Sequence, residues 1–188
     1  MDKSVVIILV VAVVAVLAIA AAIWMYLQKR RTEQLRNRFG PEYERVVEKD
    51  GDRRQAEAVL LERKKRVEKF ELRPLSREDR QRFSRARTQQ QARFVDDPRG
   101  AVAEADRLIG EVMKTRGYPV GDFEQRAADI SVDHPIVVEN YRIAHKIAIK
   151  DSQGEAGTED LRKAMVHYRA LFEDLLETRA AAAKEGRK

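Results

Sequence analysis

The chain contains no cysteine, and this absence removes several kinds of chemistry. Without thiols there can be no disulfide bridge, no thiolate nucleophile and no cysteine-ligated zinc. No Asn-x-Ser/Thr glycosylation signal occurs either. Disulfide-based folds are therefore excluded, and a reducing compartment is mildly favoured.

Glycine and histidine are scarce, with nine and three residues. The glycine-rich patterns that bind nucleotide phosphates are absent from the sequence. So are the His-Glu-x-x-His metalloprotease motif, the EF-hand loop and the Gly-x-Ser-x-Gly nucleophile motif. No catalytic class is indicated, so we expect no enzyme activity, no cofactor, no metal and no small-molecule substrate.

One long apolar run is present, from Val5 to Leu27, and it contains no charged side chain. As a helix rising about 1.5 Å per residue it is about 34 Å long, enough to cross a hydrocarbon core of about 30 Å. The small residues between Ala18 and Ala22 leave a cleaved signal peptide open, but Ile23 to Leu27 extends the run past them. We predict a transmembrane helix over residues 5–27, after a short tail over residues 1–4.

The flanking charges predict the orientation of this helix. Only Asp2 and Lys3 precede it, whereas a basic group follows, and basic flanks stay on the cytoplasmic side. Trp24 and Tyr26 lie where an interfacial aromatic belt is expected. We therefore expect an external N-terminus and a cytoplasmic C-terminal domain, with lipid headgroups contacted by Lys29, Arg30, Arg31, Arg36 and Arg38.

Charge divides the rest of the chain. Residues 28–95 carry 21 lysines and arginines against 12 acidic residues, whereas residues 96–188 carry 15 against 18. We predict a basic helical arm over residues 28–75, a helical bundle over residues 76–179 and a disordered tail over residues 180–188. The densest basic cluster, Arg63 to Arg66, is interpreted as a solvated helix face, with lipid or nucleic-acid contact as the alternative. Aromatic residues are sparse around it, so nucleic-acid binding is not expected.

Apolar spacing predicts an all-α fold: an N-terminal single transmembrane helix, the helical arm and a bundle of about four long helices. Breaks are expected at Gly40-Pro41, at Asp50-Gly51-Asp52 and at Gly117. A helix from Pro135 to Lys150 is the candidate for the centre of the core. Along the last helix a coiled-coil-like seam is formed by Leu161, Met165, Tyr168, Phe172 and Leu175.

The residues with the greatest chemical potential are concentrated between Arg116 and Tyr141. Carboxylates near a histidine can serve acid–base chemistry or hold a metal, but capping and ion pairing are the favoured interpretation. In that second interpretation, Asp122 pairs with Arg126 and Asp133 or His134 caps a helix. The candidate ligand or partner site consists of Asp122, Glu124, Arg126, Asp129, Asp133 and His134.

The other two histidines are assigned no ligand role. His145 is interpreted as a half-buried packing residue, and His167 as solvated or capping. His134 and His145 are expected on one helix, about 16 Å apart, too far to share a metal.

Four segments carry a resemblance to known sequences: residues 38–43, 94–98, 116–129 and 133–135. The motifs within them are Arg-Gly-Tyr-Pro-Val followed by Asp-Phe-Glu-Gln-Arg-Ala-Ala-Asp, and Asp-His-Pro. Together they resemble an uncharacterised bacterial family of helical proteins described as hypothetical or secreted. The resemblance implies no activity, cofactor or catalytic residue.

The leading hypothesis is a single-span membrane protein whose cytoplasmic helical domain is an interaction or scaffold module, with a protein partner or a second copy bound. An exported or cleaved envelope protein that binds cell-wall or lipid material through residues 122–134 is the first alternative. A metal-dependent hydrolase that uses Asp129, Asp133 and His134 is a weaker one.

Overall fold

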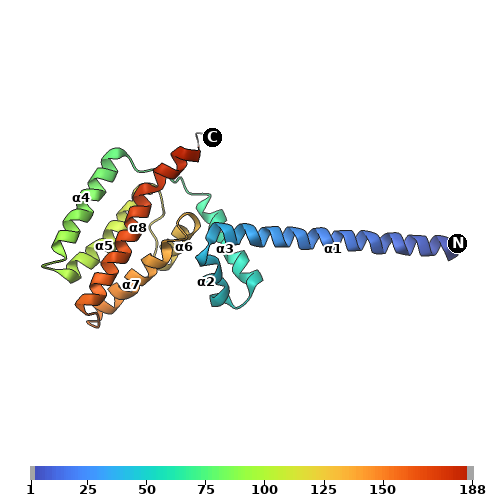
Figure 1. Ribbon diagram of the computed structural model, residues 1–188, viewed down its shortest axis with the longest axis horizontal. Coiled ribbons are helices and arrows are strands. Elements are labelled where there is room, and N and C mark those ends of the chain that lie inside the picture. Colours follow the sequence, from blue (N-terminus) through green and yellow to red (C-terminus); the bar gives the residue numbers. More distant parts are fainter. Residues whose placement is uncertain (1–2, 186–188) are drawn as a thin grey trace.

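The computed structural model describes residues 3–185, with side chains for residues 12–176, and this part of the chain is helical without a strand. The all-α prediction is confirmed. Figure 1 shows eight helices within the described range. In chain order they are α1 (Lys3–Phe39), α2 (Pro41–Asp50), α3 (Arg53–Val67), α4 (Arg77–Arg93), α5 (Pro98–Arg116), α6 (Phe123–Asp133), α7 (Val138–Ser152) and α8 (Thr158–Glu185).

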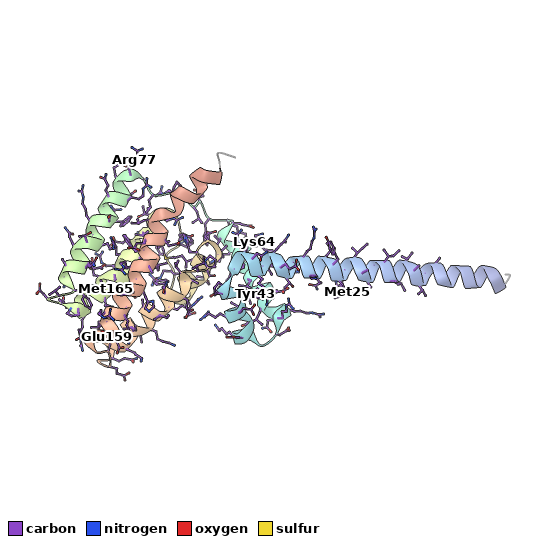
Figure 2. All side chains as sticks on the ribbon, in the orientation of Figure 1. Met25, Tyr43, Lys64, Arg77, Glu159 and Met165 are labelled. Carbon is purple, nitrogen blue, oxygen red and sulfur yellow. The ribbon has the colours of Figure 1, made fainter. Side chains whose placement is uncertain are left out.

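Helix α1 is a single rod whose N-terminal half projects from the rest of the molecule (Figure 1). In the described residues it is the one helix long and apolar enough to cross a membrane, and no residue of its apolar window is buried. Met25 lies on the projecting half (Figure 2) and is 60% exposed. The last turns differ, because Leu35 and Phe39 are buried. The C-terminal end of α1 is therefore packed into the fold, while its apolar window makes no contact that buries it.

Two predicted breaks fold the chain back at the inner end of α1. Gly40 adopts a positive φ of 48°, and Pro41 begins α2 at a position where a missing N–H is harmless. Gly51 ends α2 in the left-handed conformation, and the Asp52 side chain accepts a hydrogen bond from the Arg54 N–H at 2.9 Å. Helices α2 and α3 therefore form a hairpin that packs against α1.

This hairpin has its own hydrophobic core. Its buried members are Leu35, Phe39, Tyr43, Val46, Ala56, Leu60 and Val67, joined by Val132 from α6. The basic helical arm predicted over residues 28–75 therefore folds back on itself. It forms a small three-helix unit around the end of α1, which begins about 12 Å along the helix from Leu27.

The second core lies among α4, α5, α6, α7 and α8. Helix α5 is its centre, since it packs against α4, α7 and α8 and buries a continuous face. The expectation that residues 135–150 form the central helix is wrong. Helix α7 packs against α5, α6 and α8, but it buries fewer residues than α5, namely Val138, Tyr141 and Ala144, and leaves Ile149 exposed.

The seam on α8 faces this core. Leu161, Tyr168, Phe172 and Leu175 are buried within the chain, and Met165 is partly buried. Helix α8 ends at Glu185 and so covers most of the segment predicted as a tail. Residues 1–2 and 186–188 lie outside the residues that the structure describes.

Helix α6 contacts both cores. Ala127 and Ile130 face the second core, while Val132 faces the first. The chain then turns at His134, and α7 begins only at Val138. The prediction that Asp133 or His134 caps a helix starting at Pro135 is wrong, because Asp133 is the last residue of α6 and His134 is its C-cap.

Candidate functional site

The first three residues of the predicted site point in different directions. Asp122 caps α6, where its carboxylate accepts a hydrogen bond from the Gln125 N–H at 2.8 Å. Glu124 is exposed in the first turn of α6. Arg126 does not form the expected pair with Asp122 but turns inward to Asp106 of α5, with 3.8 Å between charged atoms. These residues begin α6 and connect it to α5.

The other three residues join α6 to separate elements. The buried Asp129 accepts hydrogen bonds from Arg66 of α3 at 3.0 Å and from Gln125 at 2.8 Å. Asp133 pairs with Arg38 of α1 at 3.5 Å and accepts a hydrogen bond from the Tyr118 hydroxyl at 3.1 Å.

His134 lies between a base and an acid. Its Nε2 contacts the Arg116 guanidinium at 3.1 Å, and its Nδ1 contacts the Asp174 carboxylate. A guanidinium can only donate, so Nε2 is the acceptor and Nδ1 carries the hydrogen donated to Asp174. His134 is thus a connector between α5, α6 and α8, rather than a residue that faces an open site.

The six residues therefore do not converge on one point. Among the described residues, no group of three or more histidine and acidic side chains is placed to hold a metal ion. Asp129, Asp133 and His134 each engage a different neighbour, an arrangement that gives the hydrolase alternative no support. The segment 122–134 is a structural junction between the two cores.

A second polar cluster lies inside the bundle around Asp106. The Tyr168 hydroxyl donates to Asp106 at 3.1 Å, and His145 lies 3.7 Å from it while stacked on the Phe123 ring. Burial opposes ionisation of this carboxylate, but His145, Arg126 and Tyr168 together hold its pKa below the ordinary value. The prediction of His145 as a packing residue is confirmed. His167 is not simply solvated, because its Nδ1 contacts Asn140 of α7 at 2.8 Å.

A buried interhelical polar contact is centred on Glu42, which the sequence did not single out. Glu42 is 2% exposed in the first turn of α2. It accepts two hydrogen bonds from Arg142 of α7, at 2.7 and 2.8 Å, and a third from Arg63 of α3 at 2.8 Å. Bidentate arginine–carboxylate pairs are among the strongest side-chain contacts. This carboxylate fixes the hairpin to the bundle across 100 residues of sequence.

The basic cluster from Arg63 to Arg66 has mainly internal roles. Arg63 binds Glu42 and Arg66 binds Asp129, both across helix boundaries. Lys64 and Lys65 pair along α3 with Glu68 and Glu62. The interpretation as a solvated face holds for the lysines and for Arg66, which is 45% exposed although it pairs with Asp129, but it is wrong for Arg63, which is 17% exposed.

The predicted lipid-contact residues separate into two groups. Lys29, Arg30 and Arg31 are exposed on α1, directly after the apolar run. Arg36 pairs with Glu44 at 2.6 Å and Arg38 pairs with Asp133, so these two contact the protein itself.

The fold adds arginines from α3 to the exposed group. A shallow groove beside the end of the apolar run is lined by Trp24, Met25, Gln28, Lys29, Thr32, Arg53, Arg54 and Glu57. The start of α3 therefore lies at the level of Gln28 and Lys29. We call Lys29, Arg30, Arg31, Arg53 and Arg54 the basic collar.

A deeper, apolar groove is present on the bundle between α4 and α8. Its floor is formed by Ala105, Leu108 and Ile109 of α5, and its walls include Phe94, Met165 and Phe172. The enclosed volume is about 170 Å³. We call this the α4–α8 groove. It exists because α4 lies along α5 rather than along α8.

Polar groups of two kinds border the α4–α8 groove. Gln90 lines it and is 6% exposed, and its Nε2 has no hydrogen-bond partner within the described residues. Three arginines, Arg87, Arg162 and Arg169, stand around it. An apolar hollow with a few oriented polar groups is the usual composition of a binding site. The sequence carried one signal for it, since Gln90 occupies a position of α4 that helical spacing from Phe83 and Phe94 assigns to the core.

In comparisons with known proteins, no protein-family model matches the chain, and no curated protein or solved structure is significantly similar to it. The resemblance noted in the sequence therefore stays a prediction.

Proposed function

We propose that this chain is a single-pass membrane protein of a bacterium whose helical domain acts on the cytoplasmic side as an interaction or scaffold module. The observation that carries the proposal is α1. Over its described side chains from residue 12 to residue 27, α1 exposes an apolar surface, with Val13, Leu17, Ile23 and Trp24 each at least 50% exposed. A contiguous apolar surface of this extent is stable only when it is shielded from water. The length of the apolar run matches the thickness of a lipid bilayer, so lipid is the environment that it fits.

The inner end of α1 supports an anchor over a cleaved signal peptide. The helix runs without interruption from the apolar run into Phe39, which is fully buried. The anchor is thus continuous with the first core, and the folded domain starts close to the bilayer. A spacer that separates the two is absent from the described residues.

The basic collar supports a cytoplasmic position for the domain. Anionic lipids attract lysine and arginine close to the surface, within a Debye length of about 8 to 10 Å. The fold brings Arg53 and Arg54 to the same level as Lys29. Arg53 also bonds Tyr43 and Glu57 through its Nε, but its side chain stays 59% exposed, so the collar favours contact with the inner leaflet.

The absence of cysteine makes a clean topology experiment possible. Single-cysteine variants Ser4→Cys and Ser84→Cys are expressed as the full chain and treated with a membrane-impermeant maleimide. We expect Ser4→Cys to be labelled in intact spheroplasts and Ser84→Cys only after permeabilisation. The mass of the purified chain should include residues 1–27.

Two results would overturn the proposal. Labelling of Ser84→Cys in intact cells would place the domain outside the membrane. Loss of about the first 20 residues would indicate signal-peptide cleavage. Either outcome would favour the exported envelope protein instead. The cysteine-free parent chain is the control, since it should show no labelling under any condition.

A further inference from the structure

We propose that the α4–α8 groove binds an acidic amphipathic helix of a partner protein, which inserts one large apolar side chain. The inference rests on the proposed role as an interaction module and names the surface and the chemistry of its partner. It is argued from the groove's size, its charge, its unpaired donor and its position.

Size selects a side chain rather than a lipid tail. An apolar cavity of about 150 Å³ holds a single benzene-sized group. At about 170 Å³, the α4–α8 groove accepts one aromatic or branched aliphatic side chain and is too small for a whole acyl chain. Helices that dock in grooves present such anchors from one face.

Charge selects an acidic partner. Of the six arginines of helix α4, Arg87 lines the groove. On the opposite side, Arg162 and Arg169 of α8 border the groove. Arg162 pairs with Glu159, and Arg87 pairs with Glu173, which itself is about half exposed. Carboxylates placed one helical turn before and after the apolar anchor would face these arginines from both sides.

Gln90 supplies a donor within the hollow. A buried amide N–H without a partner loses about 1 to 3 kcal/mol of free energy relative to a paired one. The Nε2 atom itself is buried beneath the groove surface, so a carboxylate or amide oxygen of the partner would accept this hydrogen bond once the Gln90 side chain rotates toward the occupant. The unpaired donor is therefore a second indication of an occupant, independent of the apolar lining.

Position separates this groove from the membrane. Figure 1 shows α4 and the adjoining part of α8 on the opposite side of the molecule from the projecting half of α1, and Met165 is labelled there in Figure 2. A lipid would have to leave the bilayer completely to reach the α4–α8 groove. A soluble protein segment reaches the groove directly.

The first experiment is a selection. A display library of helical 14-residue peptides is selected against the full chain in nanodiscs and counter-selected against Met165→Trp protein, in which the larger side chain fills the groove. We expect enriched peptides with one large apolar residue and Glu or Asp three or four positions away on both sides. Enrichment of basic or uncharged peptides, or no enrichment over Met165→Trp, would overturn the inference.

A matched pair of variants at Val166 then tests the charge. Val166 is 42% exposed at the edge of the groove, so either substitution leaves the core intact. We expect Val166→Glu to weaken binding of the selected peptide at least tenfold and Val166→Lys to weaken it less than threefold. Equal losses for both variants would show that charge is not recognised and would overturn the acidic partner.

A second pair tests the arginines. Arg169→Glu should weaken binding of the selected peptide at least fivefold. Arg77→Glu makes the same charge change at the exposed start of α4 and should change the peptide's affinity less than twofold. Circular dichroism of each variant confirms its helix content. If the two variants lost the same affinity for the peptide, binding would depend on general charge attraction, and a site in the groove would be contradicted.

Other occupants give different results. Self-association of the full chain that Met165→Trp abolishes would make the occupant a second copy. Binding of oleate in place of peptide would make it a lipid. Peptide binding by a chain that does not insert into the membrane would overturn the proposed function but not the binding role of the groove. Membrane insertion without peptide binding would overturn the binding role of the groove but not the proposed function.

Discussion

At Glu42 a single carboxylate holds three helices together. It is almost fully buried, yet Arg63 and Arg142 supply donors to both of its oxygens. A buried charge is tolerated only with such partners, since the loss of solvation is large. The contact joins an acidic residue of the hairpin to Arg142 of the bundle.

We predict that Glu42→Gln destabilises the full chain by about 3 kcal/mol, the lower end of the range for breaking a buried ion pair. The lower end applies because the Arg63 and Arg142 side chains are 17% and 10% exposed, so both stay partly hydrated when the pair is broken. Urea unfolding in detergent micelles, followed by circular dichroism, measures the loss.

Glu44→Gln is the matched control, because Glu44 pairs with Arg36 at the surface. Exposed ion pairs contribute about 0 to 1 kcal/mol. If the two variants lost the same stability, Glu42 would not be the connection between hairpin and bundle.

Helix ends decide how the elements meet, and Gly117 is the most constrained of them. It closes α5 with a φ of 96°, and a Cβ atom there would lie 2.5 Å from the backbone oxygen of Glu71. The Arg73 N–H also donates to the Arg116 carbonyl oxygen at 2.9 Å. The extended segment after α3 therefore lies directly on the end of α5.

We predict that Gly117→Ala destabilises the chain by about 3 kcal/mol, because backbone strain and a backbone clash combine. Gly51→Ala is the control, since Gly51 also has a positive φ but a Cβ there meets nothing within 4 Å. Gly51→Ala should lower the free energy of unfolding by about 1 kcal/mol, because it introduces backbone strain without a clash. Equal thermal shifts for the two variants would show that the approach of residue 71 is not tight.

Two cores share helix α6, so the described part of the chain should unfold as one unit. Val132 belongs to the first core while Ala127 and Ile130 belong to the second. Arg66 and Arg142 add polar connections across the same boundary. A rigid connection of this kind transmits the orientation of α1 to the α4–α8 groove.

We predict that amides of α3 and α5 exchange with the same opening free energy in the full chain. In the double variant Arg66→Gln/Arg142→Gln, the opening free energies of α3 and α5 should fall together, by about 3 kcal/mol. Hydrogen-exchange mass spectrometry in nanodiscs measures both.

The control double variant is Arg82→Gln/Arg162→Gln, whose pairs lie at the surface within one helix. It should leave both helices unchanged. Independent exchange of α3 and α5 in the unmodified chain would contradict the shared unit.

Local rules predicted most of the elements. The helix breaks at Gly40 and Gly51 and the end of α5 at Gly117 follow from residue chemistry over a few positions. The boundary at His134 was missed, because the turn there is stabilised by contacts with Arg116 and Asp174, which are distant in sequence.

The sequence by itself determined the helical class, the apolar helix and its basic flank, because each depends on composition and spacing along the chain. Only the tertiary structure decided what the charges do. Arg38, Arg63 and Arg66 resemble solvated cations in the sequence, yet each lies against a carboxylate from another helix. The α4–α8 groove has the same origin, since a hollow depends on how three helices diverge, and spacing within one helix carries no record of that angle.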